Sequence, residues 1–183
     1  MKNLLVITLS IFSFFAIKAE KYITKTGHIS FYSEAPLENI EADNNQVTSI
    51  LDTESGEMVF SVLMKGFQFE KALMQEHFNE KYIHSEKYPK STFQGKIVDL
   101  SAVDFSKDGE YEVEVEGTLN LHGESKTIKS PGTLEVKDGE INANATFNLT
   151  VADYNIEIPS VVEDNIADVV EVRVKMNYKP FKK

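Results

Sequence analysis

The sequence contains no cysteine among its 183 residues. This absence excludes disulfide bonds, thiolate catalysis, cysteine metal sites and a lipid anchor attached to cysteine. The fold must therefore be stabilised by its apolar core alone. A chain of this length is long enough to bury one good core and too short to suggest two.

Basic side chains are also scarce. Lysine and arginine together number 19 against 29 aspartates and glutamates, and the formal net charge is −10. Without Lys2 and Lys18, which fall in the N-terminal segment discussed next, 17 basic side chains face the same 29 acidic ones. Nucleic acids and anionic membranes are bound by clustered lysine and arginine, so neither is a predicted partner. The acidic residues are scattered through alternating segments, which is typical of a solvated outer face.

Only one long apolar run occurs, and it lies at the N-terminus. It extends from Leu4 to Ile17, follows Lys2 and precedes the small residue Ala19. Its length of about 14 residues is shorter than the roughly 20 that a membrane-spanning helix needs. This order predicts a signal peptide over residues 1–19, with cleavage after Ala16 as an alternative. Residues 20–183 would then form one periplasmic or secreted domain. A buried N-terminal helix and an uncleaved anchor are the competing interpretations.

Alternation of apolar and polar residues dominates the rest of the chain. A period of two indicates strands with one buried face. In the clearest run, residues 111–121, the odd positions are apolar or glycine and the even positions are polar. The pattern predicts about eight strands, at Ile29–Tyr32, Val47–Leu51, Met58–Met64, Thr92–Leu100, Tyr111–Leu121, Thr133–Val136, Ile141–Val151 and Val170–Tyr178.

Turn-forming residues separate these runs. Aspartate, asparagine, serine and glycine favour tight reversals. They predict turns at Asp43-Asn44-Asn45, Glu54-Ser55-Gly56, Lys107-Asp108-Gly109, His122-Gly123-Glu124-Ser125 and Lys137-Asp138-Gly139.

Two segments depart from the alternation. Apolar residues between Phe69 and Tyr82 recur as on one face of a helix, which predicts an amphipathic helix of about three to four turns. The stretch from Asp153 to Ala167 is irregular and contains Pro159. We expect it to form a long connection over one end of a barrel.

Long strands with one apolar and one charged face fit either a sandwich of two sheets or a closed barrel with an apolar interior. A lipid-embedded barrel would have the opposite sidedness, with apolar residues outside. The outer faces here carry glutamate, asparagine, lysine and threonine, so we do not expect a membrane-embedded barrel. The residues predict an all-β fold with one amphipathic helix, and they leave the sandwich and the closed barrel open.

Three segments resemble motifs of the YceI-like family. Asn79 to Phe93 resembles the passage from a helix into a Tyr-Pro-x-x-Thr-Phe strand start. Gly117 to Lys126 resembles the family's Gly-x-Leu-x-Leu-x-Gly-x-x-Lys hairpin, and Phe147 to Ile156 resembles a penultimate strand that ends in an Asp-Phe/Tyr-Asn-Ile turn. The three occur in the family's order, and the resemblance covers essentially the whole chain after the leader.

The resemblance implies an extended, lipocalin-like barrel of eight antiparallel strands with a hydrophobic tunnel. It further implies binding of polyisoprenoid or similar amphiphilic chains, and export to the bacterial periplasm. Two features depart from the pattern. The chain contains no tryptophan and so lacks the Gly-x-Trp mark of true lipocalins, and residues 155–168 differ from the family's sequence.

The residues themselves also favour a binding tunnel. The inner faces of an eight-stranded barrel either fill the interior with side chains or enclose one small ligand. Gly117, Ala143 and Ala145 are small residues on these faces and predict unfilled volume. We expect the tunnel to be lined by Phe31, Phe60, Val62, His77, Phe93, Val113, Val115, Leu119, Phe147, Leu149, Val172, Val174 and Met176.

The sequence contains no recognisable catalytic or metal-binding motif. A metal site needs at least three convergent ligands, and the four histidines show no such arrangement. We therefore predict no catalytic residues, no metal and no cofactor other than a bound isoprenoid or quinone-like lipid. His77 lies on the apolar side of the predicted helix, where it could contact a ligand head group. A hydrolase or isomerase that uses His77 with a nearby glutamate is the least favoured alternative.

These observations predict a carrier or buffer of an isoprenoid-like or other amphiphilic lipid rather than an enzyme. Its partner would be a hydrophobic small molecule whose tail is reversibly buried in the barrel. The competing prediction is a ligand-free structural or stress-response interaction module, in which the barrel serves only as a scaffold. The sequence leaves the oligomeric state open, a homodimer included.

Overall fold

The computed structural model describes residues 21–181, and the predicted signal peptide lies outside them. Most of the described chain is β-strand. The strands are β1 Lys21–Glu34, β2 Asn39–Asp52, β3 Glu57–Leu63, β4 Gln68–Phe69, β5 Lys90–Ile97, β6 Gly109–Leu121, β7 Glu124–Lys137, β8 Glu140–Thr150 and β9 Val169–Pro180. The helix α1 spans Ala72–His77 and continues as a π-type turn over Phe78–Tyr82. Short 3₁₀ turns cover Met64–Gly66, Leu100–Ala102, Val151–Tyr154 and Ser160–Val162.

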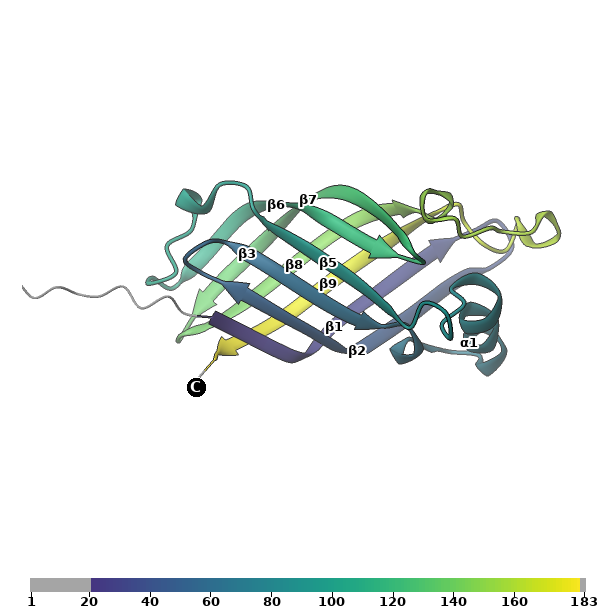
Figure 1. Cartoon of the computed structure of the whole chain (residues 1–183), viewed down its shortest axis with the longest axis horizontal. Coiled ribbons are helices and arrows are strands. Elements are labelled where there is room, and N and C mark those ends of the chain that lie inside the picture. The colour runs from purple at the N-terminus through teal and green to yellow at the C-terminus, as the bar shows by residue number, and fades with distance from the viewer. Residues whose placement is uncertain (1–20, 182–183) are drawn as a thin grey trace, which may run out of the picture.

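The strands close into a barrel. Their order is β1-β9-β8-β7-β6-β5-β3-β2, and β1 also pairs with β2, so the sheet returns to its first strand. All of these pairs are antiparallel. The two-residue strand β4 is added beside β2, where Phe69 pairs with Ala42. The predicted eight-stranded antiparallel barrel is therefore confirmed (Figure 1).

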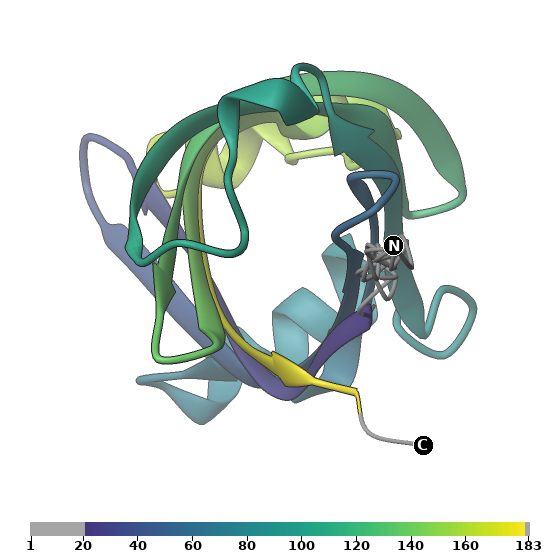
Figure 2. The same ribbon diagram turned by 90° about the vertical axis from the view of Figure 1, so that its left-hand side faces the viewer.

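Side chains alternate between the two faces of the wall, as the sequence pattern requires. In β6, Glu112, Glu114 and Glu116 are exposed, whereas Val113 and Val115 between them are partly buried and face inward. Figure 2, a view along the barrel, shows the ring of strands with α1 beyond it. No helix within residues 21–181 has the length and hydropathy needed to cross a bilayer.

Two predicted reversals are tight hairpins. His122 and Gly123 have φ values of 52° and 84°, and Asp138 and Gly139 have values of 52° and 78°. Two consecutive positive φ angles are the mark of the type I′ turn, whose twist matches that of the flanking strands.

The turn predicted at Asp43-Asn44-Asn45 is wrong, because these residues lie inside β2. Gly27 pairs with Val47 and Ile29 with Asn44, so two steps along β1 match three along β2 and the strand bulges there. The Asn44 side chain is fully buried, donates to the carbonyl oxygen of Leu63 at 2.8 Å and accepts from the Gln46 N–H at 2.9 Å. The polar side chain thus supports a bulge rather than a reversal.

The predicted helix starts three residues later than expected. Phe69 belongs to β4 rather than to the helix, because its backbone pairs with Ala42 of β2. Helical structure begins at Ala72 and extends to Tyr82. The irregular segment between β8 and β9 lies at the same end of the barrel as α1 (Figure 1). We call this the helix end.

Candidate binding cavity

A cavity of about 650 Å³ occupies the half of the barrel interior nearest the helix end. All eight barrel strands contribute to its wall, and α1 and the β8–β9 connection cover its outer part. Its volume falls within the range of small-molecule sites, roughly 300–1,000 Å³. The wall is formed mainly by valine, leucine, isoleucine and phenylalanine side chains. An apolar, elongated molecule would find few polar groups to contact inside it.

Of the thirteen residues predicted to line a tunnel, the structure places twelve along this cavity. The exception is Met176, which is 3 % exposed and fills the space above Gly27, where a side chain is missing. Met176 therefore packs in the solid part of the barrel. The twelve are Phe31, Phe60, Val62, His77, Phe93, Val113, Val115, Leu119, Phe147, Leu149, Val172 and Val174.

Many of these side chains point inward and yet remain partly exposed. Phe60, Phe93, Phe147 and Val172 are only half-buried, because the space in front of them is empty enough to admit solvent. A filled barrel would have buried them completely. We call this region the hollow half.

The opposite part of the interior is solid, and we call it the filled half. Its inward-facing side chains are Leu51, Ile97, Val136, Ile141, Met176 and Tyr178, and Leu51, Ile141 and Tyr178 are 0 % exposed. The Tyr178 hydroxyl donates to Ser49 Oγ at 2.7 Å, and Ser49 donates to the carbonyl oxygen of Val59 at 3.0 Å. Burial raises the pKa of Tyr178 far above that of an ordinary phenol.

The small residues of the wall behave differently from one another. The expectation that Gly117 leaves unfilled space is wrong, because the backbone of β5 and the Phe93 ring lie against it: a Cβ at Gly117 would clash with the Gln94 carbonyl oxygen and with Gly95 Cα, and would stand 2.6 Å from Phe93 Cζ. Gly132, Ala143 and Ala145, by contrast, do line the cavity. Glycine in β6 thus makes room for an aromatic side chain, whereas alanine in β8 leaves space for a ligand.

The wall itself is split between β7 and β8 toward the helix end. Their ladder extends from Lys137 paired with Glu140 to Gly132 paired with Ala145, and stops there. The next residue, Pro131, has no N–H to donate, and its carbonyl oxygen accepts a hydrogen bond from Ser130 Oγ at 2.9 Å. We call this opening the seam. Ile128 and Ser130 on one side of it and Phe147 and Leu149 on the other line the cavity.

An aromatic cluster holds α1 against the barrel. It consists of Phe31 on β1, Phe67 and Phe69 before the helix, and Phe78 in the helix, with ring centroids 5.0–5.9 Å apart. Phe31 and Phe78 stack with an interplanar angle of 24°. Of this cluster only Phe31 was predicted to line the tunnel, whereas Phe69 and Phe78 were predicted only as part of the apolar face of the helix.

The cavity reaches the surface beside α1, at what we call the mouth. Leu73 lines the cavity and is 59 % exposed. Two neighbouring segments also present apolar side chains, since Leu37 and Val161 are 72 % and 87 % exposed. The Leu37 N–H donates to the Asp164 carbonyl oxygen at 2.9 Å, which ties the β1–β2 turn to the β8–β9 connection. The irregular connection is therefore part of the mouth.

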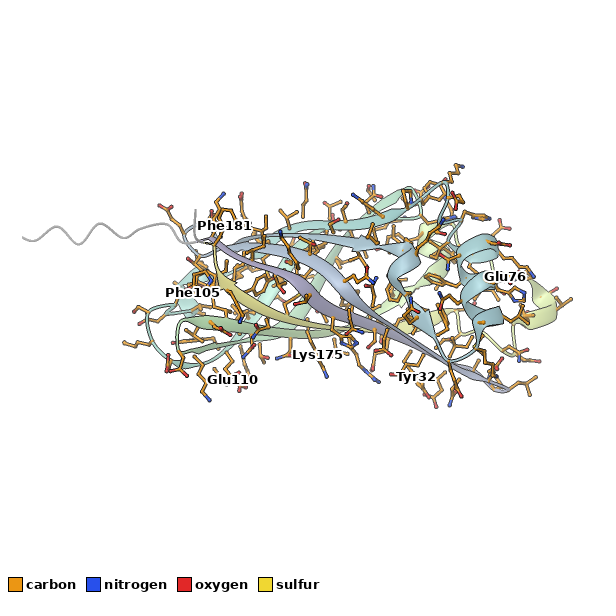
Figure 3. All side chains as sticks on the ribbon, turned by 90° about the horizontal axis from the view of Figure 1, so that it is seen from below. Tyr32, Glu76, Phe105, Glu110, Lys175 and Phe181 are labelled. Atoms are coloured by element: carbon orange, nitrogen blue, oxygen red, sulfur yellow. The ribbon has the colours of Figure 1, made fainter. Side chains whose placement is uncertain are left out.

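An ion pair links the two sides of the mouth. Lys71 Nζ lies 2.7 Å from Glu38 Oε1, and both side chains line the cavity. The hydrogen bond and charge of Glu38 raise the pKa of Lys71 above its ordinary value, which keeps the ammonium charged. Figure 3 shows Glu76 on the outside of α1 at this end, with Phe105 and Phe181 at the opposite end.

The four histidines lie at three separate places in the barrel. His77 ends α1 and lines the cavity, whereas His28 contacts Asp43 Oδ1 at 2.6 Å. His84 Nδ1 and His122 Nε2 are 3.0 Å apart, and His122 Nδ1 donates to the Tyr154 carbonyl oxygen at 2.9 Å. Residues 21–181 contain no group of three side chains placed to ligate a metal ion.

Comparison with known proteins assigns the fold to a family. The model of the YceI-like domain matches residues 18–178. The chain belongs to the YceI-like domain family. The resemblance of its helix exit, central hairpin and penultimate strand to that family is thereby confirmed.

Solved structures share the YceI-like barrel at low sequence identity. A polyisoprenoid-binding domain from Saccharophagus degradans superposes with a TM-score of 0.77 at 18 % identity, over 90 % of this chain and 100 % of that one. BcnA of Burkholderia cenocepacia gives 0.69 at 16 % identity, over 82 % and 95 % of the two chains. A Campylobacter jejuni YceI protein gives 0.62 at 16 % identity, over 82 % and 90 %. A search of curated proteins finds no match.

Proposed function

We propose that this protein binds an elongated apolar small molecule, an isoprenoid-like lipid, in the hollow half of its barrel. The observation that supports this most directly is the 650 Å³ cavity with inward-facing but half-exposed apolar side chains. Membership of the YceI-like family supports the same function, and one structural neighbour is described as a polyisoprenoid-binding domain. The twelve cavity-lining residues named above are the proposed contacts.

The energetics favour a hydrocarbon chain. Each buried methylene contributes roughly 0.8 kcal/mol, so ten buried groups would contribute about 8 kcal/mol before the cost of immobilising the ligand. Two of the hydroxyls that line the cavity already have partners within the protein: Ser91 donates to the Asn120 carbonyl oxygen at 2.8 Å and Ser130 to that of Pro131. These two hydroxyl protons therefore require no acceptor from the ligand.

We infer reversible binding rather than catalysis. Among residues 21–181, no nucleophile beside an oriented base lines the cavity, and His77 is the one histidine that does. With the leader predicted over residues 1–19, the protein would act outside the cytoplasm, where it would carry or buffer the lipid between membranes or partners.

The test is native mass spectrometry of the protein purified from its own host, followed by organic extraction and identification of the lipid. The proposal predicts a bound molecule in a one-to-one ratio, with an isoprenoid-like or comparable amphiphilic chain. An unliganded mass, together with no uptake of added prenyl alcohol or quinone, would instead favour a scaffold that takes no ligand.

A further inference from the structure

We infer that the mouth selects an uncharged polar head group and discriminates against an anionic one. This inference rests on the proposed function, since it concerns the polar end of the molecule whose tail occupies the cavity. Such a mouth would bind prenyl alcohols and quinones in preference to prenyl phosphates and fatty acids, although all of these molecules have an apolar tail.

The first observation is the charge of the cavity wall. Within residues 21–181, two charged side chains line the cavity, those of Glu38 and Lys71. They pair with each other at 2.7 Å. Among residues 21–181, the one lysine that lines the cavity is thus already paired with a carboxylate.

The second observation is that two hydroxyls deeper inside the cavity, those of Ser91 and Ser130, are already engaged within the protein. A charge that enters an apolar wall without a partner is strongly disfavoured, because its hydration is lost and nothing replaces it. Ser91 and Ser130 donate their hydroxyl protons to backbone carbonyl oxygens. An anionic head could therefore not be drawn into the hollow half and would have to stay at the mouth.

The third observation is the charge around the mouth. Three segments surround it, residues 34–38, 69–82 and 157–168, and they carry nine acidic side chains against two lysines. The acidic ones are Glu34, Glu38, Glu70, Glu76, Glu80, Glu157, Glu163, Asp164 and Asp168. This excess repels an anion over about a Debye length, which is roughly 8 Å at physiological salt.

Hydrogen-bonding side chains at the mouth suit an alcohol or carbonyl head. Asn165 of the β8–β9 connection and His77 of α1 both line the cavity. An amide and an imidazole can each donate or accept a hydrogen bond. A neutral head group would bond to such side chains without breaking the Glu38–Lys71 pair.

The experiment compares ligands that share one tail. Farnesol, farnesoic acid, farnesyl phosphate and farnesylamine are titrated by displacement of an apolar fluorescent probe at low and at high salt. Farnesol is expected to bind at least tenfold more tightly than the acid and the phosphate. The difference should shrink at high salt, because screening weakens repulsion at the mouth. An acid or a phosphate that binds as tightly as farnesol, or an amine that binds no more tightly than the acid, would overturn the inference.

Two variants test the ion pair itself. Glu38→Gln releases Lys71 and is expected to raise the ratio of farnesoic acid affinity to farnesol affinity about fivefold. Lys71→Gln leaves Glu38 unpaired and should lower the same ratio. The matched control is Glu114→Gln, which breaks a pair with Lys129, also 2.7 Å, on the outer face of the barrel. The control should leave the ratio unchanged. An unchanged ratio in Glu38→Gln would contradict the assignment.

These outcomes can be told apart from failure of the proposed function. If no farnesyl compound displaces the probe, the cavity does not bind such tails. If all of them displace it with equal affinity, the cavity binds the tail and the selectivity at the mouth is wrong.

Discussion

The filled and hollow halves of the barrel are built from the same strands, and they differ in side-chain size. Along β9, Tyr178 and Met176 fill the interior. Val174 and Val172, which lie two and four residues before Met176, do not reach across it. Along β8, Ile141 is fully buried while Ala145 faces the cavity. The alternating pattern therefore determines the barrel, and the size of its inward residues determines where the barrel is empty.

A second contrast lies within one pair of strands. Residues 132–137 of β7 pair with β8, whereas residues 124–131 of the same strand lie beyond the last pair of that ladder, Gly132 with Ala145. The change occurs at Pro131, which cannot donate to a neighbouring strand. Both contrasts place the solid interior and the β7–β8 ladder at one end, and the cavity and the seam at the helix end.

The largest expected difference between the halves is in stability. Leu51→Ala in the filled half should lower the free energy of unfolding by about 3 kcal/mol, because it leaves a cavity in a packed core. Leu119→Ala in the hollow half should cost about 1 kcal/mol or less, since that side chain already borders empty space. Urea denaturation of both variants checks this. Equal losses would mean that the hollow half is packed in solution.

Filling the cavity should abolish binding without unfolding the protein. Ala145→Phe places a ring in the hollow half, and we expect affinity for an apolar ligand to fall at least tenfold, or about 1.4 kcal/mol. Thr146→Phe, on the outer face of the same strand, is the matched control and should leave affinity unchanged. Probe titration measures both, and circular dichroism verifies that each variant folds. Retained binding in Ala145→Phe would place the ligand elsewhere.

Alkaline pH should destabilise the filled half through Tyr178. Its pKa in the folded state lies above that of an unfolded tyrosine, so the stabilisation is complete below about pH 10 and is lost as the pH rises. We expect the free energy of unfolding to fall by about 1 kcal/mol per pH unit more in the native protein than in Tyr178→Phe. Urea titrations at successive pH values above 10 compare the two. Parallel curves would show that Tyr178 is not buried in solution.

The smallest expected effect concerns the seam. Backbone amides of residues 125–131 that face β8 should exchange with solvent faster than those of residues 133–137, which lie in the paired ladder. Pro131→Val should slow exchange at its neighbours and stabilise the protein by a few tenths of a kcal/mol, since the ladder could then continue. Hydrogen exchange followed by NMR resolves these amides. Uniform protection along β7 would show that the strands stay paired.

Much of the fold could be predicted from the sequence, because strand alternation and turn composition are local signals. The strands, the helix and two tight hairpin turns follow from them, and so do twelve inward positions that the structure places along the cavity. The closed barrel was implied by the resemblance to the family, since alternation also fits a sandwich. The turn assigned to residues 43–45 failed because the same residue types also support a bulge. Whether Gly117 leaves free space depends on the neighbouring strand β5, whose backbone and Phe93 ring lie against it. No local pattern in the sequence reveals this contact.

The features that the sequence did not predict are contacts between distant segments. Glu38 and Lys71 are 33 residues apart and meet only because the β1–β2 turn and α1 lie at one end of the barrel. Likewise, inward positions in both halves show the same alternation, and only the closed barrel shows which side chains meet across the interior. Met176 was therefore assigned to the wrong half.

The most direct test of the central claim is methyl NMR of the protein titrated with farnesol. The account predicts that signals from Val113, Leu119, Val172 and Val174 in the hollow half shift on binding, whereas those of Leu51 and Ile141 in the filled half stay in place. Shifts confined to exposed methyls such as those of Val59, or no shifts at saturating ligand, would contradict the claim that the hollow half is a binding site.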